Sequence, residues 1–381
     1  MRPRVMTVYG TRPEAIKCAP LVKAIEASDD LDGLLVVTGQ HREMLDQVNE
    51  LFEITPDYDL NIMTHGQTLS QIFSRVLDGL DPVLEKEQPA AVVVQGDTTT
   101  STAAALAAFY RQIPVVHLEA GLRSGDLASP FPEEANRRLT SQIAALHLAP
   151  TATSRENLLR EGVPDERIVV TGNTVIDALL TTVGKQVPFT EAALEQLVAS
   201  GRRIVLVTTH RRESWGEPMA GVGRALATIA RRHPEVAVVL PLHRNPVVRD
   251  AVLPAVVGVE NVLVTEPLAY GEFARLMAAS TLLLSDSGGV QEEAPALGKP
   301  VLVMRDSTER PEAVEAGTVA LVGTDEDRVV TAVSRLLDDE TAYRAMANAV
   351  SPYGDGTAAR RALTAIRRTV ATDGRLGGGE R

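Results

Sequence analysis

The sequence predicts an α/β protein with two Rossmann-like, doubly wound domains. Short runs of β-branched and other apolar residues alternate with longer segments whose apolar residues recur at helical spacing. The short runs are apolar throughout, which is typical of parallel strands covered by helices on both faces. The alternation occurs twice along 381 residues, a length that fits two domains of ordinary size.

The first series of elements predicts an N-terminal domain over residues 1–183. Its expected strands are residues 5–9, 34–38, 91–95, 115–118, 146–149 and 168–171. The helical segments expected between them are residues 13–27, 41–52, 69–87 and 102–111. Residues 184–190 contain Val-Pro-Phe and have no periodic pattern, so they are the expected linker.

The second series predicts a C-terminal domain over residues 191–355. Its expected strands are residues 204–208, 236–240, 262–265, 281–285, 300–303 and 319–322. Later helices are expected at residues 325–338, 341–349 and about 356–372, the last as a candidate to pack back on the first domain. Residues 373–381 are expected to form a disordered tail. Because ligands bind at the carboxyl ends of parallel strands, we expect an active site in the cleft between two such domains.

Composition excludes several classes of protein. The formal net charge of −12 argues against a nucleic-acid partner, and 3% aromatic residues argue against a sugar-binding surface of stacked rings. No apolar stretch approaches the roughly 20 residues of a membrane span, and residues 5–9 are too short for a signal peptide. The single cysteine, Cys18, cannot form an internal disulfide, so we expect a cytoplasmic location.

The first loop of interest is Gly-Thr-Arg-Pro-Glu at residues 10–14, directly after the first strand. Gly10 permits a tight turn, and Pro13 suits the first position of a helix. Arg12 is therefore expected beside a helix N-terminus that favours anions, with Lys17 one turn further along. The alternative is a helix start with two solvated cations.

Two carboxylates follow later strands of this domain. Asp97 lies in Gln-Gly-Asp-Thr, where a helix N-cap and a catalytic role are equally well supported. Glu119 lies in His-Leu-Glu-Ala-Gly-Leu-Arg, at the end of a buried strand where an unpaired charge is costly, which favours a catalytic role. The alternative for Glu119 is a structural ion pair with Arg123 or Arg137.

A third carboxylate candidate begins a helix in Phe-Pro-Glu-Glu-Ala-Asn-Arg-Arg at residues 131–138. Acidic residues in a first helical turn also complement the helix dipole. We take Glu133 as the candidate catalytic group, whereas for Glu134 the dipole role is equally well supported.

The second domain offers cations and a glycine pair. His210 and Arg211, in Thr-His-Arg-Arg-Glu-Ser, suit charge-assisted bonds to phosphate, and His243 in Pro-Leu-His-Arg-Asn-Pro is either a packing residue or a ligand contact. Residues 285–293 run from a strand through Ser-Gly-Gly into a helix, where backbone N–H groups can approach a diphosphate. The pattern is neither Gly-x-Gly-x-x-Gly nor a Walker sequence. Arg310 adds a cation after the next strand.

Taken together, these motifs resemble the bacterial, non-hydrolysing UDP-N-acetylglucosamine 2-epimerases over nearly the whole chain. The resemblance implies the GT-B fold, usually as a homodimer, and interconversion of UDP-GlcNAc and UDP-ManNAc with no cofactor and no metal. It implies that the catalytic residues are Asp97, Glu119, Glu133 and His210. The substrate-binding residues expected from the motifs and the resemblance are Arg12, Lys17, Arg211, His243, Phe273, Ser287, Gly288, Gly289, Glu293 and Arg310.

Two details of the resemblance concern single segments. Leu268 stands where some members of the family have glutamine, near the expected contact to the base. Gln-His-Arg-Glu at residues 40–43 resembles the segment that binds a second UDP-GlcNAc as an activator in several bacterial members. Gln40, His41 and Glu43 are therefore candidates for an allosteric site.

The chemistry requires elimination, because the C2–H bond of the sugar is not α to a carbonyl. Loss of UDP first would give C1 oxocarbenium character and acidify that bond, leaving 2-acetamidoglucal beside bound UDP. Glu119 or Asp97 would then act on one face and Glu133 on the other. The alternatives are a hydrolysing 2-epimerase, a GT-B glycosyltransferase and a catalytically silent UDP-sugar sensor.

Overall fold

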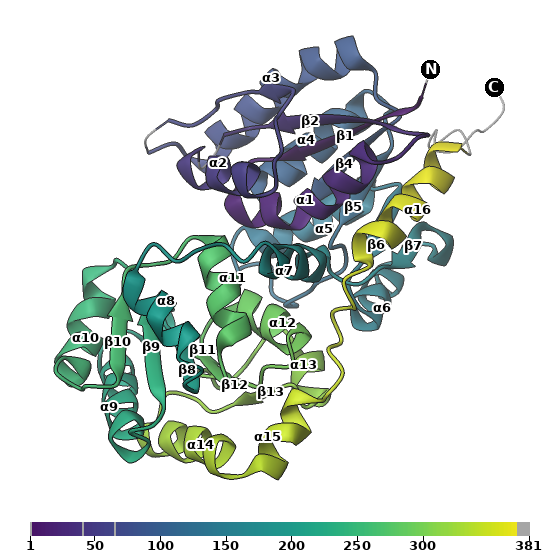
Figure 1. Ribbon diagram of the computed structural model, residues 1–381. Coiled ribbons are helices and arrows are strands. Elements are labelled where there is room, and N and C mark those ends of the chain that lie inside the picture. The colour runs from purple at the N-terminus through teal and green to yellow at the C-terminus, as the bar shows by residue number, and fades with distance from the viewer. Residues whose placement is uncertain (1, 40–41, 65, 372–381) are drawn as a thin grey trace. The chain divides into compact units, whose positions relative to one another are not determined.

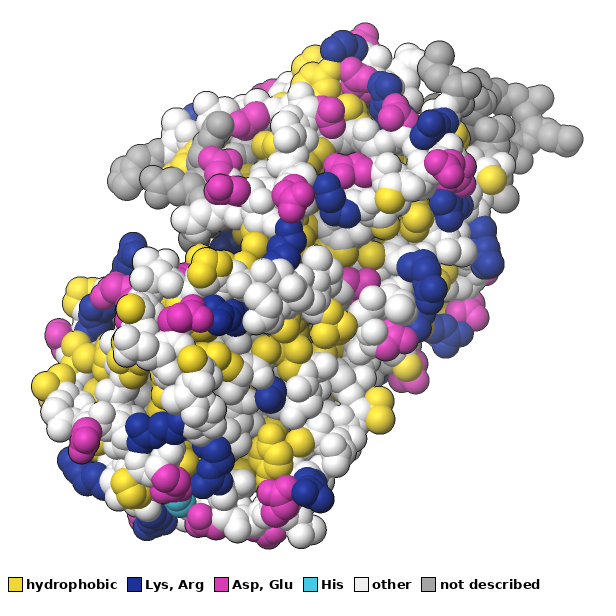
Figure 2. Space-filling model, viewed as in Figure 1, with side chains coloured by type: hydrophobic (Ala, Val, Ile, Leu, Met, Phe, Trp, Pro, Cys, Tyr) yellow, Lys and Arg dark blue, Asp and Glu magenta, His cyan; other side chains and the backbone are white. Residues whose placement is uncertain are grey.

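The computed structural model describes residues 2–39, 42–64 and 66–371, the side chains of residues 42–44 excepted. The chain divides into two compact units (Figure 1). The first unit holds the residues up to Ala178 together with those from Tyr353 onward, and the second is Leu179–Pro352. The face shown in Figure 2 carries acidic and basic side chains interspersed. In the described part of the chain, no helix is both long and apolar enough to cross a membrane.

The first unit contains a seven-stranded parallel sheet of order β3-β2-β1-β4-β5-β6-β7. Its strands are β1 (Arg4–Tyr9), β2 (Asp32–Val37), β3 (Tyr58–Asp59), β4 (Ala91–Gln95), β5 (Val115–Leu118), β6 (Leu146–Ala149) and β7 (Ile168–Val170). The sequence analysis missed β3, because two residues carry no periodic signal. The other six lie within two residues of the predicted bounds.

Helices cover this sheet. They are α1 (Arg12–Glu26), α2 (Arg42–Leu51), α3 (Leu69–Glu87), α4 (Thr99–Tyr110), α5 (Glu133–Ile143), α6 (Ala152–Arg160), α7 (Thr174–Gly184) and α16 (Ala358–Ala371), with a short 3-10 turn at Asp165–Arg167. α4 begins earlier than predicted because Thr98 caps it, accepting the Ser101 N–H at 3.0 Å. α3, α4 and α5 pack side by side, and α16, contributed by the end of the chain, packs on α1.

The second unit contains a six-stranded parallel sheet of order β10-β9-β8-β11-β12-β13. Its strands are β8 (Ile204–Thr208), β9 (Ala237–Pro241), β10 (Val262–Thr265), β11 (Leu282–Ser285), β12 (Val301–Val303) and β13 (Val319–Leu321). Its helices are α8 (Ala192–Ala199), α9 (Glu217–Arg232), α10 (Pro246–Val256), α11 (Tyr270–Ala279), α12 (Gly288–Ala296), α13 (Pro311–Glu315), α14 (Glu326–Asp338) and α15 (Glu340–Ala347), with a 3-10 turn at Arg212–Ser214.

Of the segment expected to be a linker, residues 184–190, only Gly184 lies in a helix. α7 continues to Gly184, and the two units divide inside this helix, after Ala178. Beyond α7 the chain packs on α11: the Arg275 guanidinium lies 4.5 Å from the centre of the Phe189 ring and donates to the Val187 carbonyl at 3.2 Å. Residues 187–189 are therefore ordered against the second unit.

Both sheets reverse their strand order beside the first strand of their series, which is the doubly wound arrangement. In the first sheet the reversal lies between β1 and β4, and in the second between β8 and β11. Ligands of open α/β sheets bind at such switch points, outside the carboxyl ends of the strands. The loops that begin at Gly10, Gly96, Thr209 and Asp286 lie at these points.

Candidate active site

The loop after β1 is closed by a buried carboxylate. Glu14 accepts the backbone N–H groups of Gly10 at 3.0 Å and Thr11 at 2.8 Å, and the Thr98 hydroxyl at 2.6 Å. Burial raises the pKa of Glu14, against the lowering effect of these bonds. The N–H groups of Gly10 and Thr11, just before α1, are thus already occupied. The sequence analysis assigned Glu14 no role, although Thr-x-x-Glu at a helix start is a capping-box signature.

Glu119, directly after β5, is buried and has a left-handed backbone conformation with φ of 63°. Its carboxylate pairs with Lys17 from α1 and accepts the side-chain amide of Gln95 at the end of β4. It also accepts the Asn173 amide at 2.9 Å, from the loop after β7. Three elements that are distant in sequence therefore converge on one carboxylate.

Gln95 and Asn173 contact the candidate carboxylate Glu119, and the sequence analysis did not single them out. Asn173 is fixed in turn, because its side-chain oxygen accepts the Val175 N–H at 3.1 Å and its own N–H donates to the Tyr353 carbonyl at 2.7 Å. Gln95 and Asn173 are polar residues at or just after strand ends, which is the signal that identified Glu119. The sequence analysis considered charged side chains at strand ends and not these two amide side chains.

Asp97 is held on the neighbouring loop by Arg137 of α5, with contacts of 2.9 Å from Nε and 2.6 Å from Nη2. A Cβ added to Gly96 would lie 3.4 Å from the Glu119 carboxylate, so the two candidate carboxylates are on adjacent loops. The helix N-cap here is Thr98, so the N-cap interpretation of Asp97 is wrong.

The ion pair that Glu119 forms is not one of the two that the sequence analysis considered. Arg123 makes a two-point contact with Glu161, at 2.8 and 2.7 Å, and Arg137 pairs with Asp97. Lys17 is the cation on Glu119. The structural pairing of Glu119 with Arg123 or Arg137 is therefore wrong, and the charge at the end of β5 faces a lysine from the loop-and-helix segment after β1.

Glu133 and Glu134 have opposite environments at the start of α5. Glu134 is fully buried and accepts the backbone N–H groups of Ser124 at 3.0 Å and Gly125 at 3.4 Å, as well as Arg137 at 3.2 Å. Burial raises its pKa, but the bonds from Ser124 and Arg137 outweigh that and the pKa is lowered. Glu133 is partly exposed, and its carboxylate forms no hydrogen bond or ion pair with the described residues. Glu134 thus holds the 121–132 loop, whereas Glu133 is available to a ligand.

In the second unit, the loops after β8 and β11 are joined by Asp286, which is fully buried. One carboxylate oxygen accepts the backbone N–H groups of His210 at 2.8 Å and Arg211 at 2.9 Å. The other lies 3.0 Å from Nδ1 of His210. His210 is thereby directed from the end of β8 with a fixed orientation. The sequence analysis quoted Asp286 in its motif but gave it no role.

His243, after β9, packs on His210 with the ring centres 6.0 Å apart and the planes at 26°. Its Nδ1 accepts the Asn245 N–H at 3.1 Å. Burial, and then the neighbouring His210, lower the pKa of His243. His243 is therefore a neutral packing partner of His210, and its contact with a ligand stays a prediction.

The N-terminus of α12, like that of α1, has no side-chain capping bond from its N-cap residue. Ser287 is its N-cap residue and makes no side-chain capping bond, so the first N–H groups of α12 have no such cap. A Cβ added to Gly288 would lie 2.6 Å from Nη1 of Arg310, whose guanidinium pairs with buried Glu292. Glycine at this position therefore lets a fixed cation lie against the start of the helix. A Cβ on Gly289 would meet only Glu293, at 3.6 Å.

The remaining predicted binding residues have separate positions. Glu293 is buried in α12 and accepts the Tyr270 hydroxyl at 2.8 Å, and Phe273 is partly buried on α11. Gln40 and His41 lie outside the described residues, as does the side chain of Glu43. In the described part of the chain, no group of three or more His, Cys, Asp or Glu residues could hold a metal ion.

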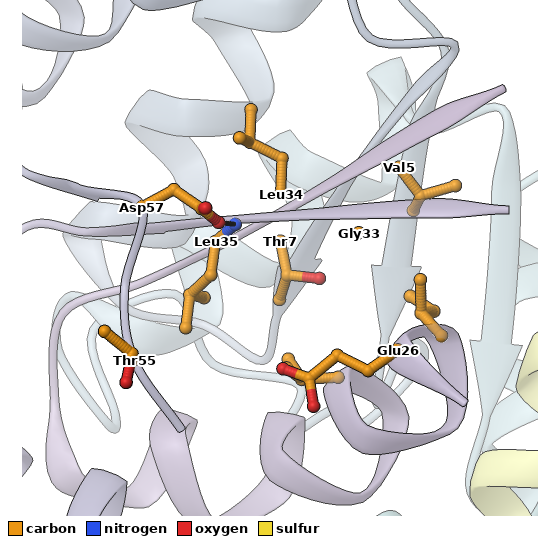
Figure 3. Close-up of a pocket in the computed structure, with 10 residues that line it drawn as sticks. Val5, Thr7, Glu26, Gly33, Leu34, Leu35, Thr55 and Asp57 are labelled. Atoms are coloured by element: carbon orange, nitrogen blue, oxygen red, sulfur yellow. Dashed lines mark hydrogen bonds between the residues drawn. The ribbon is translucent and has the colours of Figure 1, made fainter. Parts of the chain in front are cut away.

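One pocket lies away from these loops. Figure 3 shows it between α1, β1 and β2, lined among others by Val5, Thr7, Glu26 and Gly33. These residues lie within the first four positions of β1 and β2 and at the end of α1. The pocket is therefore not at the carboxyl ends of the strands, where the candidate residues gather.

Comparisons with known proteins identify the family of this chain. The family model for UDP-N-acetylglucosamine 2-epimerase matches residues 23–367. The chain belongs to the UDP-N-acetylglucosamine 2-epimerase family. It is 56% identical over 374 residues to the UDP-N-acetylglucosamine 2-epimerase of Yersinia pestis, covering 97% of this chain and 100% of that one. Its identity to the Escherichia coli K12 enzyme is 55% over 370 residues, covering 96% and 98%.

A solved structure from the same family has the same fold. The UDP-GlcNAc 2-epimerase from Neisseria meningitidis, bound to UDP-GlcNAc, aligns with a TM-score of 0.86 at 46% identity, covering 96% of this chain and 100% of that one. The predicted membership of the UDP-N-acetylglucosamine 2-epimerase family is confirmed. The prediction of two Rossmann-like sheets in a GT-B fold is confirmed as well.

Proposed function

We propose that this chain is an epimerase of UDP-N-acetylglucosamine that inverts C2 and interconverts UDP-GlcNAc and UDP-ManNAc without releasing free sugar. The observation that carries the proposal is Glu119. A buried carboxylate in a left-handed conformation, held by a lysine and two amides at the carboxyl ends of parallel strands, is a group positioned for proton chemistry. Family membership supplies the substrate on which it would act.

The reaction that these groups suit is an elimination followed by re-addition. The C1–O bond breaks with its electron pair going to the β-phosphate of UDP, and C2 loses its proton, which gives 2-acetamidoglucal. A proton then returns to the opposite face of C2, and UDP adds back to C1. Atoms balance without an oxidant or a reductant.

The second unit would hold the departing UDP. The uncapped start of α12, with the Arg310 guanidinium against Gly288, offers N–H groups and a fixed cation to a diphosphate. His210 and Arg211 add donors from the loop after β8. A diphosphate kept by several such contacts is available for re-addition, which supports the non-hydrolysing reaction over the hydrolysing one.

The first unit would supply the acid and the base. Glu119 or Asp97 would act on one face of C2, and Glu133 on the other. Support for Glu133 comes from its carboxylate, which is partly exposed and makes no bond to the described residues. Support for Glu119 comes from its three fixed partners. Arg12, Lys17, Phe273 and Glu293 remain proposed substrate contacts.

Incubation with UDP-GlcNAc in heavy water, followed by proton NMR, tests the proposal. UDP-ManNAc with deuterium at C2 is the expected product. Free ManNAc would favour the hydrolysing alternative, because water would then have trapped the intermediate. An unchanged C2 proton with no new sugar would overturn both forms of the epimerase proposal. The homodimer and the activator site at Gln40, His41 and Glu43 stay predictions of the resemblance.

A further inference from the structure

We propose that Asp286 is a positioning residue that holds a proton on Nδ1 of His210, so that Nε2 is the nitrogen presented to the leaving diphosphate. The catalytic half of this inference rests on the proposed function, in which His210 serves the departing UDP. The structural half stands on the contacts of Asp286 alone.

The two oxygens of the Asp286 carboxylate have separate partners. Oδ2 accepts three donors from the loop after β8, which are the Thr209 hydroxyl at 3.1 Å and the backbone N–H groups of His210 at 2.8 Å and Arg211 at 2.9 Å. Oδ1 is buried and accepts no hydrogen bond of standard geometry from the described residues, and the charged-pair contact of 3.0 Å to Nδ1 of His210 is its polar contact there. Oδ1 therefore faces the imidazole and nothing else that can donate.

The carboxylate is ionised at neutral pH, so it acts only as an acceptor. Burial raises the pKa of Asp286. The contact with His210 and the N–H group of Arg211 lower it by more, so the net shift is downward. An anionic oxygen 3.0 Å from Nδ1 favours hydrogen on that nitrogen, because a lone pair there would face the negative charge. In the neutral ring Nε2 then keeps its lone pair, and in the imidazolium Nε2–H is a charged donor balanced by Asp286.

The groups around His210 fit this assignment. His243 stacks on the ring but is neutral, since burial and His210 lower its pKa, and its Nδ1 already accepts the Asn245 N–H. The Arg211 guanidinium donates to the Asp286 backbone carbonyl at 3.2 Å. Asp286 is thus the anion in direct contact with the imidazole, and 43% of the His210 side chain is exposed, which leaves Nε2 accessible to a phosphate oxygen.

Asp286→Asn provides a sharp test, because one amide orientation alone keeps the three donors satisfied. The amide oxygen must replace Oδ2, so the NH2 group must replace Oδ1 and face His210. That NH2 group donates to Nδ1, which forces the proton of the neutral ring onto Nε2. The same substitution at the carboxylate of a Ser-His-Asp triad leaves the geometry intact and stabilises the wrong tautomer.

Nitrogen-15 NMR of protein labelled at histidine reports directly which ring nitrogen of His210 carries the proton. The chain has 7 histidines, and the His210→Gln spectrum assigns the signal that disappears. We expect the neutral form to carry its proton on Nδ1 in the wild type and on Nε2 in Asp286→Asn. The matched control is Thr209→Val, which removes one donor from Oδ2 but leaves Oδ1 against Nδ1. It should keep the wild-type pattern. The same tautomer in the wild type and Asp286→Asn would overturn the proposal.

Turnover tests the catalytic half. Asp286→Asn should lower kcat about 10²- to 10⁴-fold, with a smaller change in KM, as for loss of a positioned acid–base group. In a His210→Gln background, Asp286→Asn should cause no further loss of kcat, because Asp286 acts through the His210 imidazole. A further loss there, or a reversed tautomer with wild-type kcat, would overturn the catalytic half. A wild-type protein without epimerase activity would remove the proposed function instead, and the NMR result would stand.

Discussion

At the scale of single residues, the candidate site is defined by conformations and partners more than by residue types. A left-handed φ at a buried glutamate costs on the order of 1–3 kcal/mol and persists only where its surroundings impose it. The strain at Glu119 is offset by Lys17, Gln95 and Asn173, of which Asn173 is 54 positions away in sequence. A charged residue after a buried strand could be recognised from sequence. Its conformation and its partners could not, because the fold brings them together.

Glu119→Gln should leave the fold intact and lower turnover by about 10²- to 10⁴-fold, because the amide keeps the volume but cannot take a proton. Proton NMR gives kcat, and a thermal unfolding curve reports the fold. Asn173→Ala is the companion variant: it removes one donor and leaves the carboxylate, so it should lower kcat less. Ordinary activity in Glu119→Gln would remove this residue from the mechanism.

The adjacent pair Glu133 and Glu134 gives a matched comparison. Glu133→Gln should lower kcat and leave the free energy of unfolding unchanged, because the side chain has no partner in the described chain. Glu134→Gln should lower the free energy of unfolding by about 1.5–3 kcal/mol, since bonds to a buried charge are lost. Urea unfolding and kcat separate the two. Lost stability in Glu133→Gln together with lost kcat in Glu134→Gln would exchange the roles assigned to these two residues.

The Glu134 effect should also depend on pH. The folded pKa of Glu134 is lowered, so its ionised form stabilises the protein above the usual carboxyl value of 4.5. That contribution is lost as pH falls below this value and through the lower folded pKa. The difference in unfolding free energy between wild type and Glu134→Gln should therefore be constant from pH 7 to about 5.5 and shrink at pH 4. A difference that grows on acidification would contradict this assignment.

At the scale of elements, the two helix starts that the sequence analysis expected to bind anions differ in the charged side chain that lies against them. Neither N-cap side chain makes a capping bond, but the buried Glu14 carboxylate lies at the start of α1, whereas the Arg310 guanidinium lies against Gly288 at the start of α12. The two starts look alike in sequence, as each follows a strand and carries small or polar residues. The sequence analysis therefore expected anion binding at both. The difference depends on which charged side chain the fold places at each helix start, and a motif does not encode that by itself.

The two glycines of α12 should respond differently to alanine. Gly288→Ala would place a Cβ 2.6 Å from Nη1 of Arg310, so it should displace the guanidinium, lower the melting temperature and weaken UDP binding. Gly289→Ala meets no close atom and should leave the free protein as stable or up to about 1 kcal/mol more stable. It should weaken UDP binding alone. Thermal unfolding with and without UDP measures both effects, and equal behaviour of the two variants would contradict the distinct roles.

At the scale of the whole molecule, the two sheets repeat one plan. Each reverses its strand order beside the first strand of its series, and each has a buried carboxylate joining the loops at that point, Glu14 in the first and Asp286 in the second. The sequence predicted the two series because apolar runs and helical spacing are local patterns. It could not predict that the domain boundary lies inside α7, because a helix crosses it without any change of period.

The chain returns to the first unit at Tyr353, and this last segment contacts both α1 and the loop that holds Asn173. Asp177 accepts the N–H groups of Ala358 at 3.1 Å and Ala359 at 2.9 Å at the start of α16, which packs on α1. The Tyr353 carbonyl accepts the N–H of Asn173, the residue that contacts Glu119. Truncation after Pro352 should therefore remove support from α1 and from the Glu119 carboxylate, while the second sheet keeps its own core.

Hydrogen exchange followed by mass spectrometry measures this truncation directly. Peptides from α1 and β5 should lose protection, those from β8 and β11 should keep it, and epimerase activity should disappear while UDP still binds. Arg367→Ala is the control, because it removes an exposed pair with Asp30 that contributes little to stability. Wild-type protection of α1 in the truncated chain would show that α16 covers the first unit without stabilising it. The coupling from the chain return to Glu119 would then have to be abandoned.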